Sequence, residues 1–309
     1  MKSNTTIRAR KGIWKIFGYW ELYVLFLPTF LYFVIFQYGP MYGIQLAFKN
    51  FNPILGIWGS HWTGFDQFIR FFKLYQFGRL IWNTLSISLY GLVANFPFPI
   101  ILALLLNQLY SMKFKKVVQT VSYAPYFIST VVLCGMLFIF LSPSSGAVNS
   151  IIKLIGGQPI FFMGEPGTFR HLYVWSGVWQ STGYGAIIYI AALSGVNPEL
   201  HEAAIVDGAS RLRRIWHIDL PGIIPTIVIM FILNMGRIMS VGFEKAFLMQ
   251  TPLNLETSEV ISTYVYKVGL LNAQYSFSTA VGLFNSVINL ILVVTVNKIA
   301  KTVSTVSLW

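Results

Sequence analysis

Few side chains in this sequence have the types and spacing that chemistry requires. The nearest to a catalytic pattern is the run His201-Glu202-Ala203-Ala204-Ile205. A zinc protease helix needs a second histidine four residues after the first, and Ile205 stands at that position, so we expect no metal site. The sequence also lacks a phosphate-binding loop of the form G-x-x-x-x-G-K-[ST]. We therefore expect that this chain binds no cofactor and is not an enzyme.

Arg237 is a second residue of interest, because it is a charge inside an apolar stretch. Asn234, three residues earlier, shares its face of a helix. Charged side chains within membrane segments often mark a substrate path, so Arg237 and Asn234 are candidates for lining one. Two structural alternatives stay open. Arg237 extends to the membrane surface, or it pairs with Glu244 across the end of the helix.

The composition places these residues in a membrane protein. Hydrophobic side chains make up 55% of the 309 residues and charged ones only 10%, which leaves too little polar surface for an ordinary soluble protein. A membrane-spanning helix needs about 20 mostly apolar residues. Six stretches qualify, at 22–38, 80–109, 117–141, 172–193, 223–240 and 279–296. The sequence predicts an all-α integral membrane protein with six transmembrane helices, the second kinked or tilted at Pro97 and Pro99.

The basic residues predict the orientation of these helices. With both termini in the cytoplasm, thirteen of the 22 lysines and arginines lie in cytoplasmic segments, eight lie outside and Arg237 lies in a span. This is the positive-inside distribution of membrane proteins. The formal net charge of +12 is therefore explained by topology, and we expect no nucleic-acid partner.

The predicted cytoplasmic loop between the fourth and fifth stretches carries clear helix signals. Asn197 can cap a helix that begins at Pro198, and Gly208 allows a sharp turn after it. Ser210 can cap a second short helix. That helix should end near 220, because Pro221 disfavours helical geometry in the residue before it.

The same loop resembles the EAA signature of permease subunits of bacterial ABC importers. The signature positions are Glu202-Ala203-Ala204, Gly208 and Ile218-x-Leu220-Pro221, and all of them match. Asp207 and Ala209, on either side of the glycine, make the loop most similar to the carbohydrate-uptake branch. Segments 47–65 and 179–195 resemble permeases for complex oligosaccharides. The resemblance implies the architecture of type I ABC importer permeases.

The resemblance also implies partners. The loop would form a coupling helix that binds a separate ATPase subunit through Glu202, Ala203, Ala204, Asp207, Gly208 and Arg211. Arg211 is the weaker candidate, since it also serves as a positive-inside charge. Two such subunits would carry ATP and Mg²⁺, and a second homologous permease would complete the path. An extracellular solute-binding protein would deliver the oligosaccharide to the outer segments, and lipid would surround the helices.

Aromatic rings and amides commonly bind sugars, so further residues become candidates for the path. They are Trp179, Gln180 and Tyr184 in the fourth stretch, and Asn285 and Asn289 in the sixth. The alternative for each is an interfacial anchor or a hydrogen bond between helices. With Arg237 in the path, an acidic oligosaccharide such as one containing uronate becomes a candidate substrate.

The resulting organisation has four parts. They are a basic cytoplasmic tail (1–20), a first helix with an extracellular segment (21–78), a permease core (79–298) with the coupling loop at 195–222, and a cytoplasmic tail (299–309). One alternative is an ABC permease for another solute. A second is an ion-driven transporter, against which stands the absence of a carboxylate from the predicted spans. A third, an intramembrane enzyme, lacks paired catalytic residues.

Overall fold

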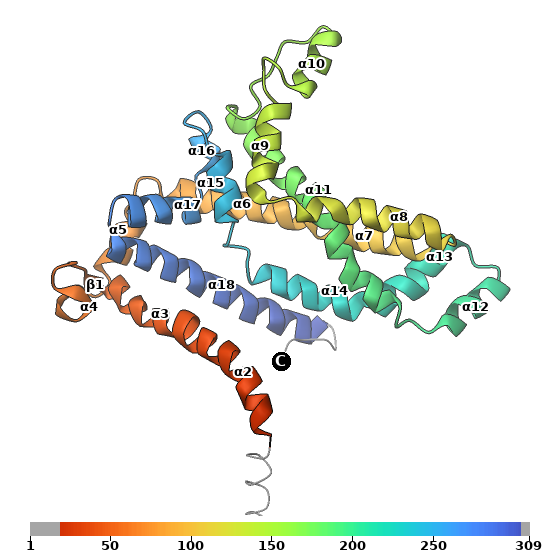
Figure 1. Cartoon of the computed structure of the whole chain (residues 1–309), viewed down its shortest axis with the longest axis horizontal. Coiled ribbons are helices and arrows are strands. Elements are labelled where there is room, and N and C mark those ends of the chain that lie inside the picture. Colours follow the sequence, from red (N-terminus) through yellow and green to blue (C-terminus); the bar gives the residue numbers. More distant parts are fainter. Residues whose placement is uncertain (1–18, 304–309) are drawn as a thin grey trace, which may run out of the picture.

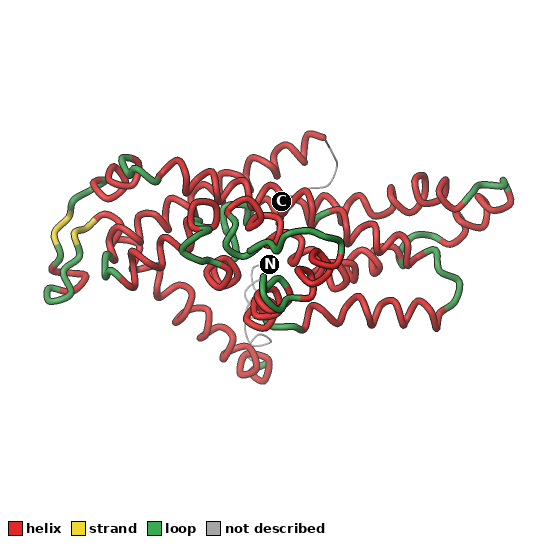
Figure 2. The backbone as a smooth tube through the Cα atoms, turned by 90° about the horizontal axis from the view of Figure 1, so that it is seen from above, coloured by secondary structure: helices red, strands yellow, loops and turns green. Residues whose placement is uncertain are grey.

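The computed structural model describes residues 19–303, and most of them are helical (Figures 1 and 2). Four helical stretches are long and apolar enough to cross a membrane: Trp20–Phe48, Phe77–Asn107, Arg211–Met235 and Tyr275–Thr302. A bent pair, Met112–Phe127 and Thr130–Phe140, adds a fifth if its halves form one span. The helical fold class is confirmed, whereas six spans and two cytoplasmic termini stay predictions. Most of the predicted basic tail, 1–18, lies outside the described residues.

The first span is a rod that leans away from the other helices (Figure 1). It consists of α2 (Trp20–Tyr32), a π-helical turn (Phe33–Tyr38), α3 (Gly39–Met41) and a 3₁₀ segment (Tyr42–Phe48). Every side chain from residue 19 to 42 is exposed, and the 3₁₀ segment at the end of the rod packs on α18 (Tyr275–Val303). The predicted first helix is therefore confirmed and extends further than expected.

A small structure at one end of the molecule follows this rod. It contains β1 (Lys49–Asn50), α4 (Gly56–Gly59), β2 (His61–Trp62) and α5 (Asp66–Phe72). The two strands are antiparallel, with Lys49 opposite Trp62. The Lys49 ammonium donates a 2.7 Å hydrogen bond to the Ile57 carbonyl and lies 4.7 Å from the centre of the Trp62 ring, which fixes the loop by charge and cation–π attraction.

The second span is one long helical rod with a break near its middle. It comprises α6 (Phe77–Asn95) and α7 (Pro97–Asn107). Pro97 stands at the first position of α7, where its missing N–H is least costly. The prediction of a long helix interrupted by proline is confirmed.

The prediction of a continuous third span over 117–141 is wrong. Helix α8 (Met112–Tyr123) and a 3₁₀ turn (Ala124–Phe127) are bent by 95° from α9 (Thr130–Phe140). Pro125 itself has no amide donor to continue the helical hydrogen bonds, and Ile128 and Ser129 are extended. The Ser129 hydroxyl then accepts from the Val132 amide 3.3 Å away and starts a new helix. A proline and a cap together stop the first helix and redirect the second.

Helix α11 (Pro166–Leu193) is the centre of the bundle and contains the predicted fourth span. It packs against α6, α7, α8 and α14 (Leu220–Met235). Buried residues of α11, α7 and α14 form one core cluster: Ala103, Leu104, Ala186, Tyr189, Leu193 and Ile223. The helix is confirmed, although it is not apolar enough to count among the four clear spans.

The predicted fifth span, 223–240, has the wrong limits at both ends. The chain is helical from Arg211 to Met235, through α13 (Arg211–Arg214), a π-helical segment (Ile215–Asp219) and α14. The short helix predicted to end near 220 therefore continues through Pro221. Pro221 falls in the first turn of α14, directly after the π-helical segment, where the missing donor is tolerated. At the other end α14 stops at Met235, so Arg237 lies beyond the helix.

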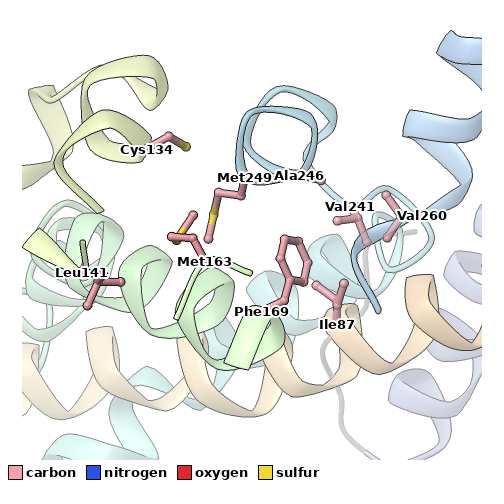
Figure 3. Close-up of a cluster of buried hydrophobic side chains, with 9 residues drawn as sticks. All are labelled: Ile87, Cys134, Leu141, Met163, Phe169, Val241, Ala246, Met249 and Val260. Atoms are coloured by element: carbon pink, nitrogen blue, oxygen red, sulfur yellow. The ribbon is translucent and has the colours of Figure 1, made fainter. Parts of the chain in front are cut away.

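The remaining short helices follow α9 and α14 along the chain. They are α10 (Ala147–Leu154), α15 (Phe243–Met249), α16 (Leu255–Ser258), α17 (Ile261–Tyr266) and a π-helical segment (Lys267–Leu271). Figure 3 shows the apolar cluster that joins α15 to α6, α9 and α11, with members Ile87, Cys134, Leu141, Met163, Phe169, Val241, Ala246, Met249 and Val260. This packing fixes α15 beside α11.

Candidate functional site

The loop that carries the EAA pattern folds as its local signals predict. Helix α12 spans Pro198–Val206, and the Asn197 side chain accepts a 3.0 Å hydrogen bond from the Glu199 amide. The chain turns at Gly208, whose φ of 73° is a left-handed conformation that favours glycine. The Ser210 hydroxyl then accepts from the Arg213 amide at 3.4 Å and starts α13. Both caps and the glycine turn are confirmed.

Helix α12 stands free at one end of the molecule (Figure 1). Its described side chains include no buried one. Glu202, Ala203, Asp207 and Gly208 are exposed and Ala204 is half-buried, while Val206 is 87% exposed. The loop therefore offers a protruding surface of acidic, small and aliphatic groups, which suits insertion into a groove of a partner.

Arg211 has a contact within the chain. Its guanidinium carbon lies 4.8 Å from the centre of the Tyr110 ring, in the turn that follows α7. This cation–π contact attaches the start of α13 to the end of the second span. Arg211 is exposed, so the contact leaves part of its side chain accessible.

A cavity of about 410 Å³ lies among α6, α7, α11 and α14. Its lining consists of Ile87, Ser88, Gly91, Leu92, Asn95, Phe96, Pro99, Tyr173, Ser181, Gly185, Tyr189, Met230, Asn234, Arg237, Ile238, Ser240, Val241 and Gly242. Arg237 and Asn234 are both present, so the structure brings together the two residues that the sequence paired. Small, amide and aromatic groups surround them, and no acidic residue is part of the lining.

The cavity is bordered by positive charge. Arg237 lies in the turn after α14 and is exposed. Within the described residues, neither Glu244 nor any other carboxylate lies within 4.0 Å of its guanidinium. The predicted alternative of a pair with Glu244 is therefore wrong for this conformation, and the charge is available to a solute.

Lys245 supplies a second positive charge behind the cavity wall. Its ammonium donates a 2.8 Å hydrogen bond to the carbonyl of Tyr173, a lining residue, and lies 4.8 Å from the centre of the same ring. Burial lowers the pKa of Lys245 to about 8, because desolvation disfavours the charged ammonium. Together, Arg237 and Lys245 make this region attractive to anions.

The exposed loop and the polar cavity within apolar helices agree with the similarity of this chain to known proteins. Residues 95–305 match the model of the binding-protein-dependent transport system inner membrane component family. The chain belongs to this family. It is accordingly a multi-pass membrane protein and a permease subunit of an ABC transporter.

Several relatives of this permease are similar over nearly its whole length. It is 44% identical over 280 residues to Protein LplB of Bacillus subtilis (strain 168), covering 91% of this chain and 88% of LplB. It is also 44% identical over 280 residues to the polygalacturonan/rhamnogalacturonan transport system permease protein YteP of the same strain, covering 91% of this chain and 87% of YteP.

A solved structure has the same fold as the permease. It is a chain of a bacterial alginate ABC transporter in complex with alginate pentasaccharide-bound periplasmic protein, with a TM-score of 0.87 and 41% identity. The match covers 95% of this permease and 98% of that chain. The resemblance inferred from the EAA loop is therefore confirmed.

None of the three predicted path residues on α11 is part of the cavity lining, and two of them lie at the bend between α8 and α9. Trp179 is 49% exposed. The Gln180 amide donates a 2.7 Å hydrogen bond to the Ile128 carbonyl, and the Tyr184 ring stacks on Tyr126 with centres 3.8 Å apart. Their role as sugar contacts stays a prediction, whereas Gln180 and Tyr184 have a structural contact in this conformation.

The two predicted path residues on α18 also lie outside the cavity lining. The Asn289 side chain accepts a 3.0 Å hydrogen bond from the Met239 amide and donates one of 3.1 Å to the Ser240 hydroxyl. It thereby supports the non-helical segment that carries Arg237. The buried Asn285 carbonyl oxygen has no hydrogen-bond partner within the described chain.

The sequence prediction missed several groups at the cavity. Asn95 and Ser181 are polar residues within predicted spans, so the rule that selected Arg237 would have found them as well. Lys245 was counted as an outer-loop charge, and no local signal places it beside Tyr173. Its position depends on the packing of α15 against α9 and α11.

Gly183 should be essential for the contact between α11 and the bend. A β-carbon at this position would lie 1.9 Å from the carbonyl oxygen of Ser122 in α8. Gly183→Leu must therefore separate α11 from α8. We expect a loss of at least about 3 kcal/mol of stability, the upper range for overpacking in a core. Thermal unfolding of the purified permease in detergent measures it.

Gly282→Ala in α18 is the matched control for this substitution. A β-carbon there meets nothing within 4 Å, so the midpoint of unfolding should stay the same or rise. Equal midpoints for Gly183→Leu and the wild type would contradict the close contact.

Proposed function

We propose that this permease is one of two membrane subunits of an ATP-driven importer of oligosaccharides, and that the cavity is part of the path. The observation that carries the proposal is the combination of a free α12 loop at one end and a polar, cationic cavity between the helices. An external binding protein would deliver the sugar, and a second homologous permease would complete the path. Alternating access would follow from rigid-body movement of the two halves.

Acidic oligosaccharides are the proposed substrate class. YteP is named for polygalacturonan and rhamnogalacturonan transport, and a transporter of similar structure is described as importing the acidic polysaccharide alginate. In this permease Arg237 lines the cavity, Lys245 lies behind its wall, and the lining includes no carboxylate. A guanidinium can bind a sugar carboxylate through two parallel hydrogen bonds, and Asn234 and Asn95 can bond its hydroxyl groups.

The α12 loop is the proposed binding site for a separate ATPase subunit. Glu202 and Asp207 would pair with basic groups of that subunit, and Ala203, Ala204 and Gly208 would let the helix approach closely. Val206 adds an exposed apolar contact. ATP and Mg²⁺ would bind to two ATPase subunits, and this chain would not hydrolyse ATP. Arg211 would contribute at the edge of the site.

Glu202→Lys should weaken binding of the ATPase subunit. The substitution reverses an exposed charge at the centre of the loop, and placing like charges together in an interface costs about 2 kcal/mol or more. We expect about a tenfold or larger reduction in the ATPase that purifies with the tagged permease, since 1.4 kcal/mol corresponds to tenfold. Quantitative affinity purification under mild extraction measures this ratio.

Asp66→Lys is the control, because Asp66 is also an exposed acid on a helix but belongs to α5. It should leave the ratio unchanged. If no ATPase purifies with the wild type, the proposed assembly is incorrect. If Glu202→Lys retains the full amount, Glu202 is not part of the binding site.

Arg237→Gln should affect acidic substrates selectively. Removing the guanidinium leaves a sugar carboxylate in the cavity without a charged partner, and a hydrogen bond to a charged group contributes about 1.5 to 3 kcal/mol. Uptake of a galacturonate oligosaccharide into proteoliposomes should fall by about tenfold or more, while that of its carboxyl-reduced, neutral form changes little.

Lys153→Gln provides a control with the same loss of charge on α10, outside the cavity lining. It should leave both uptake rates unchanged. An equal loss of acidic and neutral uptake in Arg237→Gln would show a structural role and remove the charge-selection hypothesis.

A further inference from the structure

A buried carboxylate lies where the α12 loop meets the membrane helices. Asp219 is 0% exposed and is the least exposed acidic side chain of the described chain. It is the last residue of the π-helical segment that leads into α14. Buried charges are costly unless they are paired. The groups that pair with the Asp219 carboxylate therefore indicate its role.

The carboxylate of Asp219 connects two other parts of the chain to α14. At the end of α7, the Asn107 amide donates to its Oδ1 at 3.1 Å and the Gln108 amide donates to its Oδ2 at 2.7 Å. From α12, His201 Nε2 lies 3.2 Å from Oδ1. The two oxygens therefore contact Asn107 and Gln108, which are more than 100 residues earlier in the chain, and His201, which is on α12.

Helix α12 has few other attachments to the bundle. It buries no side chain, and His201 is one of the two half-buried residues in it, with Ala204. Among the described residues, the contact between His201 and Asp219 is the one polar side-chain contact recorded between α12 and another helix. A displacement of α12 would thus act on the bundle chiefly through Asp219 and through the backbone.

The chain entering α12 is also closely fitted to α14. A β-carbon on Gly222 would lie 2.7 Å from a methyl group of Val196, just before the helix cap. The connection before α12 and the first turn of α14 are therefore in contact, three residues after Asp219 in the chain. This contact restricts how far α12 can tilt without moving α14.

Both helices that meet at Asp219 continue to the cavity. Helix α7 supplies Pro99, and α14 supplies Met230 and Asn234. Asn234 is fifteen residues after Asp219, about 22 Å along a helix at 1.5 Å per residue. A force applied at Asp219 therefore reaches two walls of the cavity through continuous helices.

We propose that Asp219 is a positioning residue that transmits movement of the docked α12 helix to α7 and α14. The inference rests on the proposed function, because it requires an ATPase subunit to bind α12. Through His201, displacement of α12 pulls the carboxylate, and through Asn107 and Gln108 the carboxylate carries the end of α7 with it. The walls of the cavity then move together rather than independently.

Asp219→Asn tests the proposal, since it keeps the size of the side chain and replaces one acceptor oxygen with a donor. The complete transporter with its ATPase subunits is reconstituted in proteoliposomes with its binding protein and a galacturonate oligosaccharide. The amount of bound ATPase and its basal hydrolysis should stay at wild-type levels. The number of ATP molecules hydrolysed per oligosaccharide taken up should rise by about fivefold or more.

His201 gives a second pair of variants that does not disturb the buried carboxylate. His201→Leu removes the group that faces Asp219 and should raise the same ratio. His201→Gln keeps an amide that can donate to Oδ1 and should restore most of the coupling. The double variant Asp219→Asn/His201→Leu should be no worse than the more affected single variant, because both act on one contact.

Glu259→Gln is the matched control. Glu259 is another buried acid, 8% exposed, whose carboxylate pairs with Arg79 at 3.7 Å and Lys267 at 3.1 Å, outside the α12 region. Its substitution should lower thermal stability while leaving the ratio of ATP to oligosaccharide unchanged. A rise equal to that of Asp219→Asn would show that any loss of stability causes uncoupling, which would overturn the proposal.

Hydrogen exchange of the full-length permease gives a readout that needs no ATPase. Amides of α12 should exchange about fivefold faster or more in Asp219→Asn than in the wild type, and those of α17 should not change. Faster exchange with normal coupling would assign Asp219 a merely structural role, and unchanged exchange would also overturn the inference. A wild type that neither binds ATPase nor takes up sugar would contradict the proposed function itself, whatever the exchange shows.

Discussion

A backbone group that leaves a helix inside an apolar bundle must find a hydrogen-bond partner in the chain, and this constraint explains much of the permease. At three of the places where the helices break, a side-chain amide binds the backbone. Gln180 binds the carbonyl of Ile128 at the bend after α8. Asn289 binds the amide of Met239 after α14. Asn149 binds the carbonyls of Leu141 and Ser142 where α9 ends. These three side-chain amides, which could otherwise bind a polar solute, are therefore engaged in hydrogen bonds that hold the fold.

The same breaks create the polar space between the helices. The junction of α6 and α7 brings Asn95 and Phe96 to the cavity, and the end of α14 at Met235 brings Arg237 and Ser240 there. Unbroken helices with apolar side chains would close this space by packing. The two positive charges flank this irregular segment, because Arg237 lies in the turn after α14 and Lys245 lies in α15, the next helix along the chain. The cavity and its charge are consequences of where the helices stop.

Local signals in the sequence predicted local structure well. The caps at Asn197 and Ser210, the turn at Gly208 and the proline at the start of α7 act within one helical turn, so the sequence alone reveals them. The passage of the helix through Pro221 could not be read in this way, because it depends on a π-helical segment. The bend at Ile128 does have local signals, in Pro125 and the Ser129 cap, but it also depends on the bond from Gln180, 52 residues away. Arg237 was found because a charge is costly in an apolar segment, while Lys245 was missed because its burial depends on tertiary packing.

The free-standing first helix has a consequence for the timing of biosynthesis. Just after the rod ends, the Phe51 amide bonds the Ser276 hydroxyl at 2.9 Å, and these residues are 225 positions apart. At about 5 to 20 residues per second, a ribosome needs roughly 10 to 45 s to reach the second after the first. The rod has no buried side chain before residue 43, so it needs no other part of the chain to be stable in lipid. For that interval it is a separate helix in the bilayer, and the order of translation determines which neighbours it meets first.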